Sequence, residues 1–122
     1  AVDVDDDDVQ QMIEESVEHA FDDIEERRWV EAQLRAEQTT EATRKGLETY
    51  GGELPEEQRA EIETALAEVA ALLTEKEKGG PVTAASLKDS NARLDSVTQP
   101  LAELMMDRVM EQMLGNRGVL PG

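Results

Sequence analysis

Apolar residues recur at helical spacing along most of this chain, and the longest such pattern covers residues 9–50. That segment has no proline and no glycine before Gly46, and it is rich in Glu, Ala, Gln and Arg, which lose little side-chain freedom in a helix. At a rise of 1.5 Å per residue, one continuous helix there measures on the order of 60 Å, several times the width of a small helical bundle. We therefore expect part of this helix to project beyond its own domain.

A charged stretch, residues 25–28, divides the apolar stripe of this helix into two sets. The first set is Val9, Ile13, Val17, Phe21 and Ile24, and the second is Trp29, Ala36, Thr40, Thr43, Leu47 and Tyr50. We interpret the second half as packing on the rest of the chain, and the first half as an amphipathic arm whose partner lies outside it. Two helices joined by a hinge near Arg27, or a dimer seam, fit the same pattern.

Glycine and proline residues place the remaining helices. Gly51 and Gly52 suit the end of the first helix, and Pro55 suits the first position of a second helix, expected over residues 55–75. Thr83 can cap a third helix over residues 83–114, with a kink or short break near Pro100. Short connections favour antiparallel neighbours. We therefore predict an all-α fold, namely an acidic tail and projecting arm (1–28), a three-helix bundle (29–50, 55–75, 83–114) and a disordered tail (115–122).

Four methionines gather in the last helical segment: Met105, Met106, Met110 and Met113. Methionine adapts to irregular contacts, so such a cluster can form a binding surface, although at helical spacing it is more often core or a dimer contact. We expect this cluster to belong to the bundle core.

Composition limits the classes of partner. The 122 residues carry a net charge of −17, which repels nucleic acids and anionic lipid surfaces. No apolar run approaches the roughly 20 residues that cross a bilayer, and no signal-peptide pattern opens the chain. Absence of cysteine fits a reducing compartment. We expect a cytoplasmic protein without nucleic-acid or membrane partners, and the start at Ala1 suggests a piece of a longer polypeptide.

The acidic opening of the chain invites a calcium-site hypothesis. Asp3, Asp5, Asp7 and Glu14 fall at positions one, three, five and twelve of an EF-hand loop. Position six, however, requires glycine and here is Asp8. Acids that favour the positive end of a helix dipole explain the run better, so we expect no metal site.

The single histidine, His19, is flanked by Ser16 and Asp23 at helical spacing. These three residues carry the groups of a nucleophilic triad, but one exposed helix surface supplies neither oxyanion donors nor a pocket. We expect no enzymatic activity and no cofactor in this chain.

Three short motifs resemble the carboxyl-terminal end of the seventy-kilodalton heat-shock chaperones. The first, similar to the start of the family's first lid helix, is Asp8, Val9, Gln10, Gln11, Met12 and Ile13. The second, similar to the junction between the long helix and the next, is Thr43, Arg44 and Lys45 with Leu54 and Pro55. The third, residues 98–102 with Met106 and Asp107, looks more like the iron–sulfur-cluster assembly branch, the HscA type, than like DnaK-type members.

This resemblance implies a non-catalytic helical lid that closes over the peptide-binding β-domain of the same parent polypeptide and slows release of an unfolded client polypeptide. ATP and Mg would bind in an ATPase domain outside this chain. The first apolar set, Val9 to Ile24, would be the lid docking face. Glu37 would be a latch acid that contacts a β-domain loop, and Glu41 stands where many family members have histidine.

A second hypothesis is an independent helical interaction module or a homodimerisation domain. The exposed stripe of the arm would then bind another protein or a second copy of the chain. Charge repulsion opposes self-association, so added salt should strengthen it.

Overall fold

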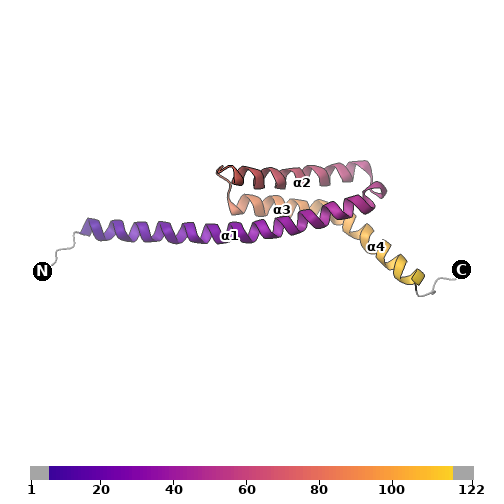
Figure 1. The fold of residues 1–122 in the computed structure, drawn as a ribbon, viewed down its shortest axis with the longest axis horizontal. Helices are drawn as coiled ribbons and strands as arrows, with labels where there is room; N and C mark the ends of the chain where they lie inside the picture. Colours follow the sequence, from indigo (N-terminus) through magenta and orange to yellow (C-terminus); the bar gives the residue numbers. More distant parts are fainter. Residues whose placement is uncertain (1–5, 117–122) are drawn as a thin grey trace.

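The computed structural model describes residues 6–116, and over that range it contains four α-helices, one 3₁₀ turn and no strand (Figure 1). The elements are α1 (Asp6–Tyr50), η1 (Gly51–Glu53), α2 (Glu56–Glu77), α3 (Ala84–Val97) and α4 (Gln99–Asn116). The all-α prediction is confirmed. The predicted acidic tail at residues 1–5 and residues 117–122 of the predicted disordered tail lie outside the described range, whereas residues 115 and 116 end α4.

Helix α1 runs without interruption through Arg27, so the alternative of two helices joined by a hinge is not observed. Three acids, Asp6, Asp7 and Asp8, occupy its first turn, where negative charge favours the helix dipole. The first half of α1 extends well past the other helices, as Figure 1 shows. Strong helix formers at the charged stretch explain the continuity, because Glu and Arg carry little helical penalty there.

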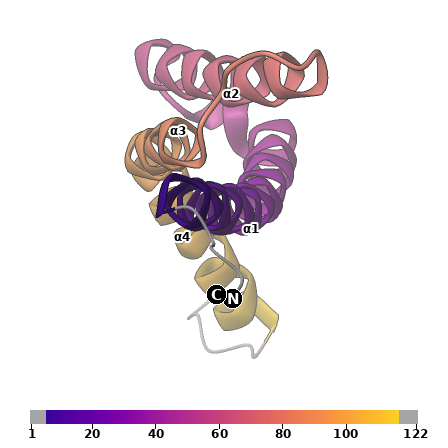
Figure 2. The same ribbon diagram turned by 90° about the vertical axis from the view of Figure 1, so that its left-hand side faces the viewer.

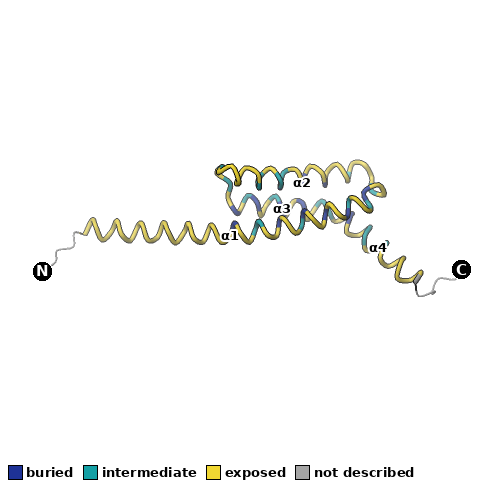
Figure 3. Tube along the Cα trace, in the orientation of Figure 1, coloured by how far each residue is buried: buried dark blue, intermediate teal, exposed yellow. Residues whose placement is uncertain are grey.

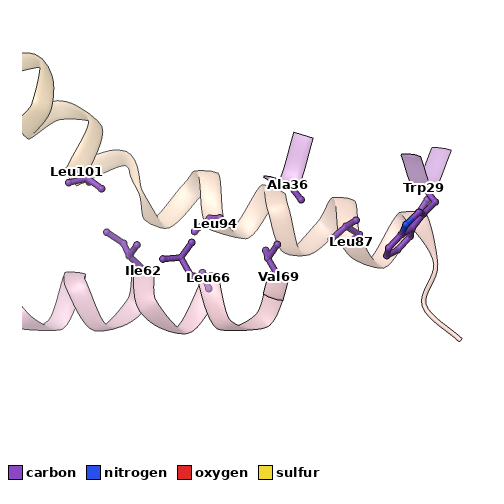
Figure 4. Packing of buried hydrophobic residues seen from close by; sticks show 10 residues of the cluster. Trp29, Ala36, Ile62, Leu66, Val69, Leu87, Leu94 and Leu101 are labelled. Carbon is purple, nitrogen blue, oxygen red and sulfur yellow. The ribbon is translucent and has the colours of Figure 1, made fainter. Parts of the chain in front are cut away.

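The bundle is formed by the second half of α1 together with α2 and α3, which lie side by side in the end-on view of Figure 2. Its core is aliphatic apart from one tryptophan and consists of Trp29, Ala36, Ile62, Ala65, Leu66, Val69, Ala84, Leu87, Leu94 and Leu101 (Figure 4). Ile62, Leu87 and Leu94 are fully buried. Burial of each such side chain contributes about 1.5–3 kcal/mol to stability.

Short turns connect α1 to α2 and α2 to α3. Gly79 has a positive φ of 83°, a conformation that favours glycine, and it ends α2 as part of the turn into α3. The Thr83 hydroxyl oxygen accepts a hydrogen bond of 3.2 Å from Ser86 N, which confirms the predicted cap of α3.

The predicted break near Pro100 is observed, but it has a larger effect than a kink. Helix α3 ends at Val97 and α4 begins at Gln99, and Figure 1 shows α4 leaving the bundle at an angle. Pro100 lies in the first turn of α4, where a missing N–H is tolerated. The segment 83–114 therefore forms two helices, and only the beginning of α4 packs on the bundle.

The methionine cluster does not enter the core as a whole. Met105 is half-buried, whereas Met106, Met110 and Met113 are 64%, 56% and 49% exposed. The core prediction is wrong for these three residues, because α4 diverges from α1 beyond its first turns. Close packing is kept only near Gly46, where an added Cβ would lie 2.9 Å from Met105 Sδ and 3.2 Å from Leu101 Cδ2.

Candidate docking face

The apolar stripe of the arm, which we define as residues 6–24 of α1, is open to solvent. Its five predicted docking residues, Val9, Ile13, Val17, Phe21 and Ile24, have exposed fractions between 39% and 66%. Met12, which is not one of the predicted docking residues, is 64% exposed beside them. Figure 3 shows that the exposure is continuous along the arm. Such a contiguous apolar surface on one helix is typical of an interaction site.

The arm ends where α1 makes its first contacts with the other helices. Glu25 Oε1 accepts a hydrogen bond of 2.8 Å from Ala84 N, the first residue of α3. Trp29 follows one turn later, is 6% exposed, and has Lys76 Nζ 5.0 Å from its ring centroid. From Trp29 onward α1 therefore behaves as a bundle helix.

The apolar stripe begins on the side of α1 that faces away from the bundle. At 3.6 residues per turn, Val9 lies about 180° around the helix axis from the buried Ala36. Toward the end of the arm the stripe turns to the side of the bundle, because Phe21 lies about 60° around the axis from Ala36.

Two exposed apolar residues extend this outer side of α1 into the bundle region. Val30 and Leu34 are 59% and 56% exposed, and Val30 lies in line with Met12, because eighteen residues make about five turns. Neither residue is among the predicted docking residues. Their spacing of four residues marks a second apolar side of α1, but spacing does not say which side the bundle covers.

The two latch candidates, Glu37 and Glu41, lie on the same outer side as Val30 and Leu34, at positions seven and eleven after Val30. Both are exposed. A chain of hydrogen bonds connects Glu37 to the core, because Trp29 Nε1 donates to Gln33 Oε1 and Gln33 Nε2 donates to Glu37 Oε1, each over 3.2 Å. The Glu41 carboxylate pairs with Lys45 Nζ at 3.1 Å. The structure thus brings these residues onto one face of α1.

The other candidate residues lie within the exposed arm. Ser16, His19 and Asp23 are solvent-exposed along α1. Asp7, Asp8 and Glu14 are helical, which differs from the loop of an EF-hand, while Asp3 and Asp5 lie outside the described range. Among residues 6–116, no group of three or more His, Cys, Asp or Glu side chains is placed to hold a metal ion. In the same range no helix combines the length and apolar character needed to cross a membrane.

Comparison with known proteins shows which family the chain is similar to. A family model described as Hsp70 protein matches residues 1–107. The chain is 32% identical over 109 residues to a chaperone protein HscA homolog of Chromobacterium violaceum, which covers 89% of the chain and 17% of that relative. It is 44% identical over 64 residues to an HscA homolog of Aromatoleum aromaticum, covering 52% of the chain and 10% of the relative. An HscA homolog of Cupriavidus necator is 31% identical over 114 residues, covering 93% and 17%. The chain thus spans only a small part of the length of these relatives.

Proposed function

The chain belongs to the Hsp70 family, and on that premise we propose that it is the helical lid of a chaperone's peptide-binding domain. The lid closes over a β-domain in another part of the parent polypeptide and slows the release of a bound client polypeptide. ATP and Mg bind in a separate ATPase domain of that parent, this chain carries no active site, and the protein works in the cytoplasm.

The observation that carries this proposal is the exposed apolar surface of α1. Val9 and Met12 begin it on the side away from the bundle, and Val30 and Leu34 continue that side past the arm. Phe21 and Ile24 extend the exposed surface part of the way around the arm. A continuous helix that is packed on a bundle at one side and is apolar and exposed at another is suited to pack on a second domain. Closing the lid buries that apolar surface, and opening the lid exposes it again.

The latch role of Glu37 fits the same side of the helix. Its carboxylate is exposed, and Gln33 connects it to the buried Trp29. In the closed lid, Glu37 accepts hydrogen bonds from a donor on the β-domain. Glu41, one turn later, is paired with Lys45, so Glu37 is the latch acid of the two that is left to bind the β-domain.

The test uses the full-length parent polypeptide in its closed state with a fluorescent peptide bound. Replacing two docking residues, Phe21→Ser with Ile24→Ser, should speed peptide dissociation by about tenfold, equivalent to about 1.4 kcal/mol, while association changes little. Ala67→Ser, on the exposed side of α2, is the control and should leave the rate unchanged. Dissociation at the wild-type rate in the double variant would contradict the lid function.

The exposed stripe also favours a second candidate, a homodimer formed through the arm. Sedimentation equilibrium of the chain alone, at low and high salt, distinguishes the two functions when it is combined with the release experiment. A dimer that strengthens with salt and dissociates on Phe21→Ser with Ile24→Ser, together with unchanged peptide release, supports the homodimer. A monomer at every ionic strength excludes it.

A further inference from the structure

A second apolar surface lies on α4, at the other end of the molecule from the arm (Figure 1). Its exposed members, which we name the outer face of α4, are Met106, Val109, Met110, Met113 and Leu114, with exposed fractions between 38% and 64%. At helical spacing these residues lie on the side opposite to Leu101 and Met105, which pack toward the bundle. Helix α4 is therefore apolar on two sides, and the bundle covers only one of them.

Contacts at its inner side connect α4 to the rest of the fold. Arg108 Nε and Nη2 donate to Glu53 Oε1 of η1 over 3.0 and 2.5 Å, and within α4 Arg108 Nη1 donates to both oxygens of Glu111. Gly46 lets the first turns of α4 approach α1 closely. The outer face is consequently held away from the bundle, where a partner can reach it.

Acidic residues border the outer face on one side. Glu103 and Asp107 each precede an apolar member of the face by three residues, namely Met106 and Met110, so each pair forms neighbours on the helix surface. Glu111 continues this row but is paired with Arg108. The chain as a whole carries a charge of −17. A second α4, an anionic membrane or a nucleic acid would bring like charge against this border, and repulsion opposes each of them.

We propose that the outer face of α4 is a docking site for a polypeptide segment that combines apolar residues with Lys or Arg. Apolar side chains of the segment pack on the three exposed methionines, and its basic side chains lie along Glu103 and Asp107. Methionine has an unbranched, polarisable side chain that adapts to differently shaped partners. The site therefore accepts segments by their composition rather than by one fixed sequence. This site is separate from the docking side of α1, and the inference does not rest on the proposed lid function.

Methionine-methyl NMR tests the proposal directly, because all five methionines of the chain are described and report on different surfaces. The probe is a synthetic amphipathic peptide of leucine and lysine, with a matched peptide in which glutamate replaces lysine. The lysine peptide should shift the methyl signals of Met106, Met110 and Met113, and the glutamate peptide should not. Met12 is the internal control, since it is 64% exposed like Met106 but lies on the arm.

Two variants locate the site. Met110→Glu should weaken binding of the lysine peptide by about tenfold, because it places a charge in the apolar contact. Met12→Glu, an equally exposed change on the arm, should not weaken it. Asp107→Lys should also lower the affinity and reduce its dependence on salt. An unchanged Met105 signal in each α4 variant shows that the helix keeps its place.

Three results would overturn the proposal. The lysine peptide could shift the methyl signal of Met12 alone, or shift those of Met12 and the α4 methionines equally. The glutamate peptide could also bind as tightly as the lysine peptide. Loss of binding in Met12→Glu but not in Met110→Glu would assign the peptide to the arm. None of these outcomes depends on peptide release by the parent polypeptide, so the lid function is tested separately.

Discussion

Glu25 Oε1 accepts a hydrogen bond of 2.8 Å from Ala84 N, across 59 residues of sequence. Ala84 begins α3, and its N–H is one of the first-turn groups that have no partner within their own helix. Thr83 satisfies Ser86 N, and Glu25 satisfies Ala84 N. The same contact fixes the point on α1 where the arm leaves the bundle.

Removing this contact should lower stability. We expect Glu25→Ala to reduce the free energy of unfolding by about 1 kcal/mol, since Ala84 N loses its acceptor in a partly buried position. Urea denaturation followed by circular dichroism measures the change. Glu26→Ala, at the exposed neighbouring position, is the control, and an equal loss in both variants would show that the contact contributes nothing specific.

Gly46 should tolerate one added carbon but not a full side chain. In Gly46→Ala the new Cβ meets the flexible end of Met105, and the cost of moving it offsets the roughly 0.5–1 kcal/mol that alanine gains over glycine in a helix. Gly46→Leu should destabilise the chain by about 1–3 kcal/mol and detach α4. Thermal unfolding and the Met105 methyl signal report both effects. A Leu variant as stable as the Ala variant would contradict the close packing of α1 on α4.

Thr40 offers a stabilising change. Its hydroxyl is buried, the residue is 8% exposed, and Oγ1 has no hydrogen-bond partner among residues 6–116. Thr40→Val keeps the shape and removes the unsatisfied group, so we expect a gain of about 1 kcal/mol in the free energy of unfolding. Thr64→Val on the exposed side of α2 should change stability little. A loss in Thr40→Val would mean that the hydroxyl is satisfied in solution.

Acid should release α4 from η1. The hydrogen bond from Arg108 holds the pKa of the Glu53 carboxyl below its ordinary value. Because folded Glu53 has the lower pKa, its contact with Arg108 stabilises α4 fully above the pKa of an unfolded glutamate, about 4.3, and is lost as pH falls through the folded value. The protection of the α4 amides, measured relative to their intrinsic exchange rate at each pH, should decrease in that range. Glu53→Gln should show the lower protection already at neutral pH, and wild-type protection that does not change with pH would contradict this role.

Several features of the fold follow directly from the sequence. Gly51, Thr83 and Pro100 act through local backbone chemistry, and the structure places a helix end, a cap and a break at these residues. The arm was also visible as a stripe cut off by charges, and its residues are exposed. Local patterns were sufficient for these features because neighbouring residues decide them.

Other features depend on residues far apart in the chain. The direction of α4 depends on Glu53 meeting Arg108 and on the absence of a side chain at Gly46, and helical spacing records neither contact. The methionines were therefore assigned to the core. Val30 and Leu34 were missed because α1 has apolar residues on two sides, and spacing alone does not say which side the bundle covers.

The most direct test of the central claim is hydrogen exchange of the arm amides, residues 9–24, compared between this chain alone and the full-length parent polypeptide with peptide bound. We expect rapid exchange in the isolated chain, because no tertiary contact holds this part of α1, and strong protection when the lid is closed. Opening the lid should remove that protection again. Equal exchange in the isolated chain and in the closed parent would show that the arm stripe is not a docking face, and would contradict the lid function.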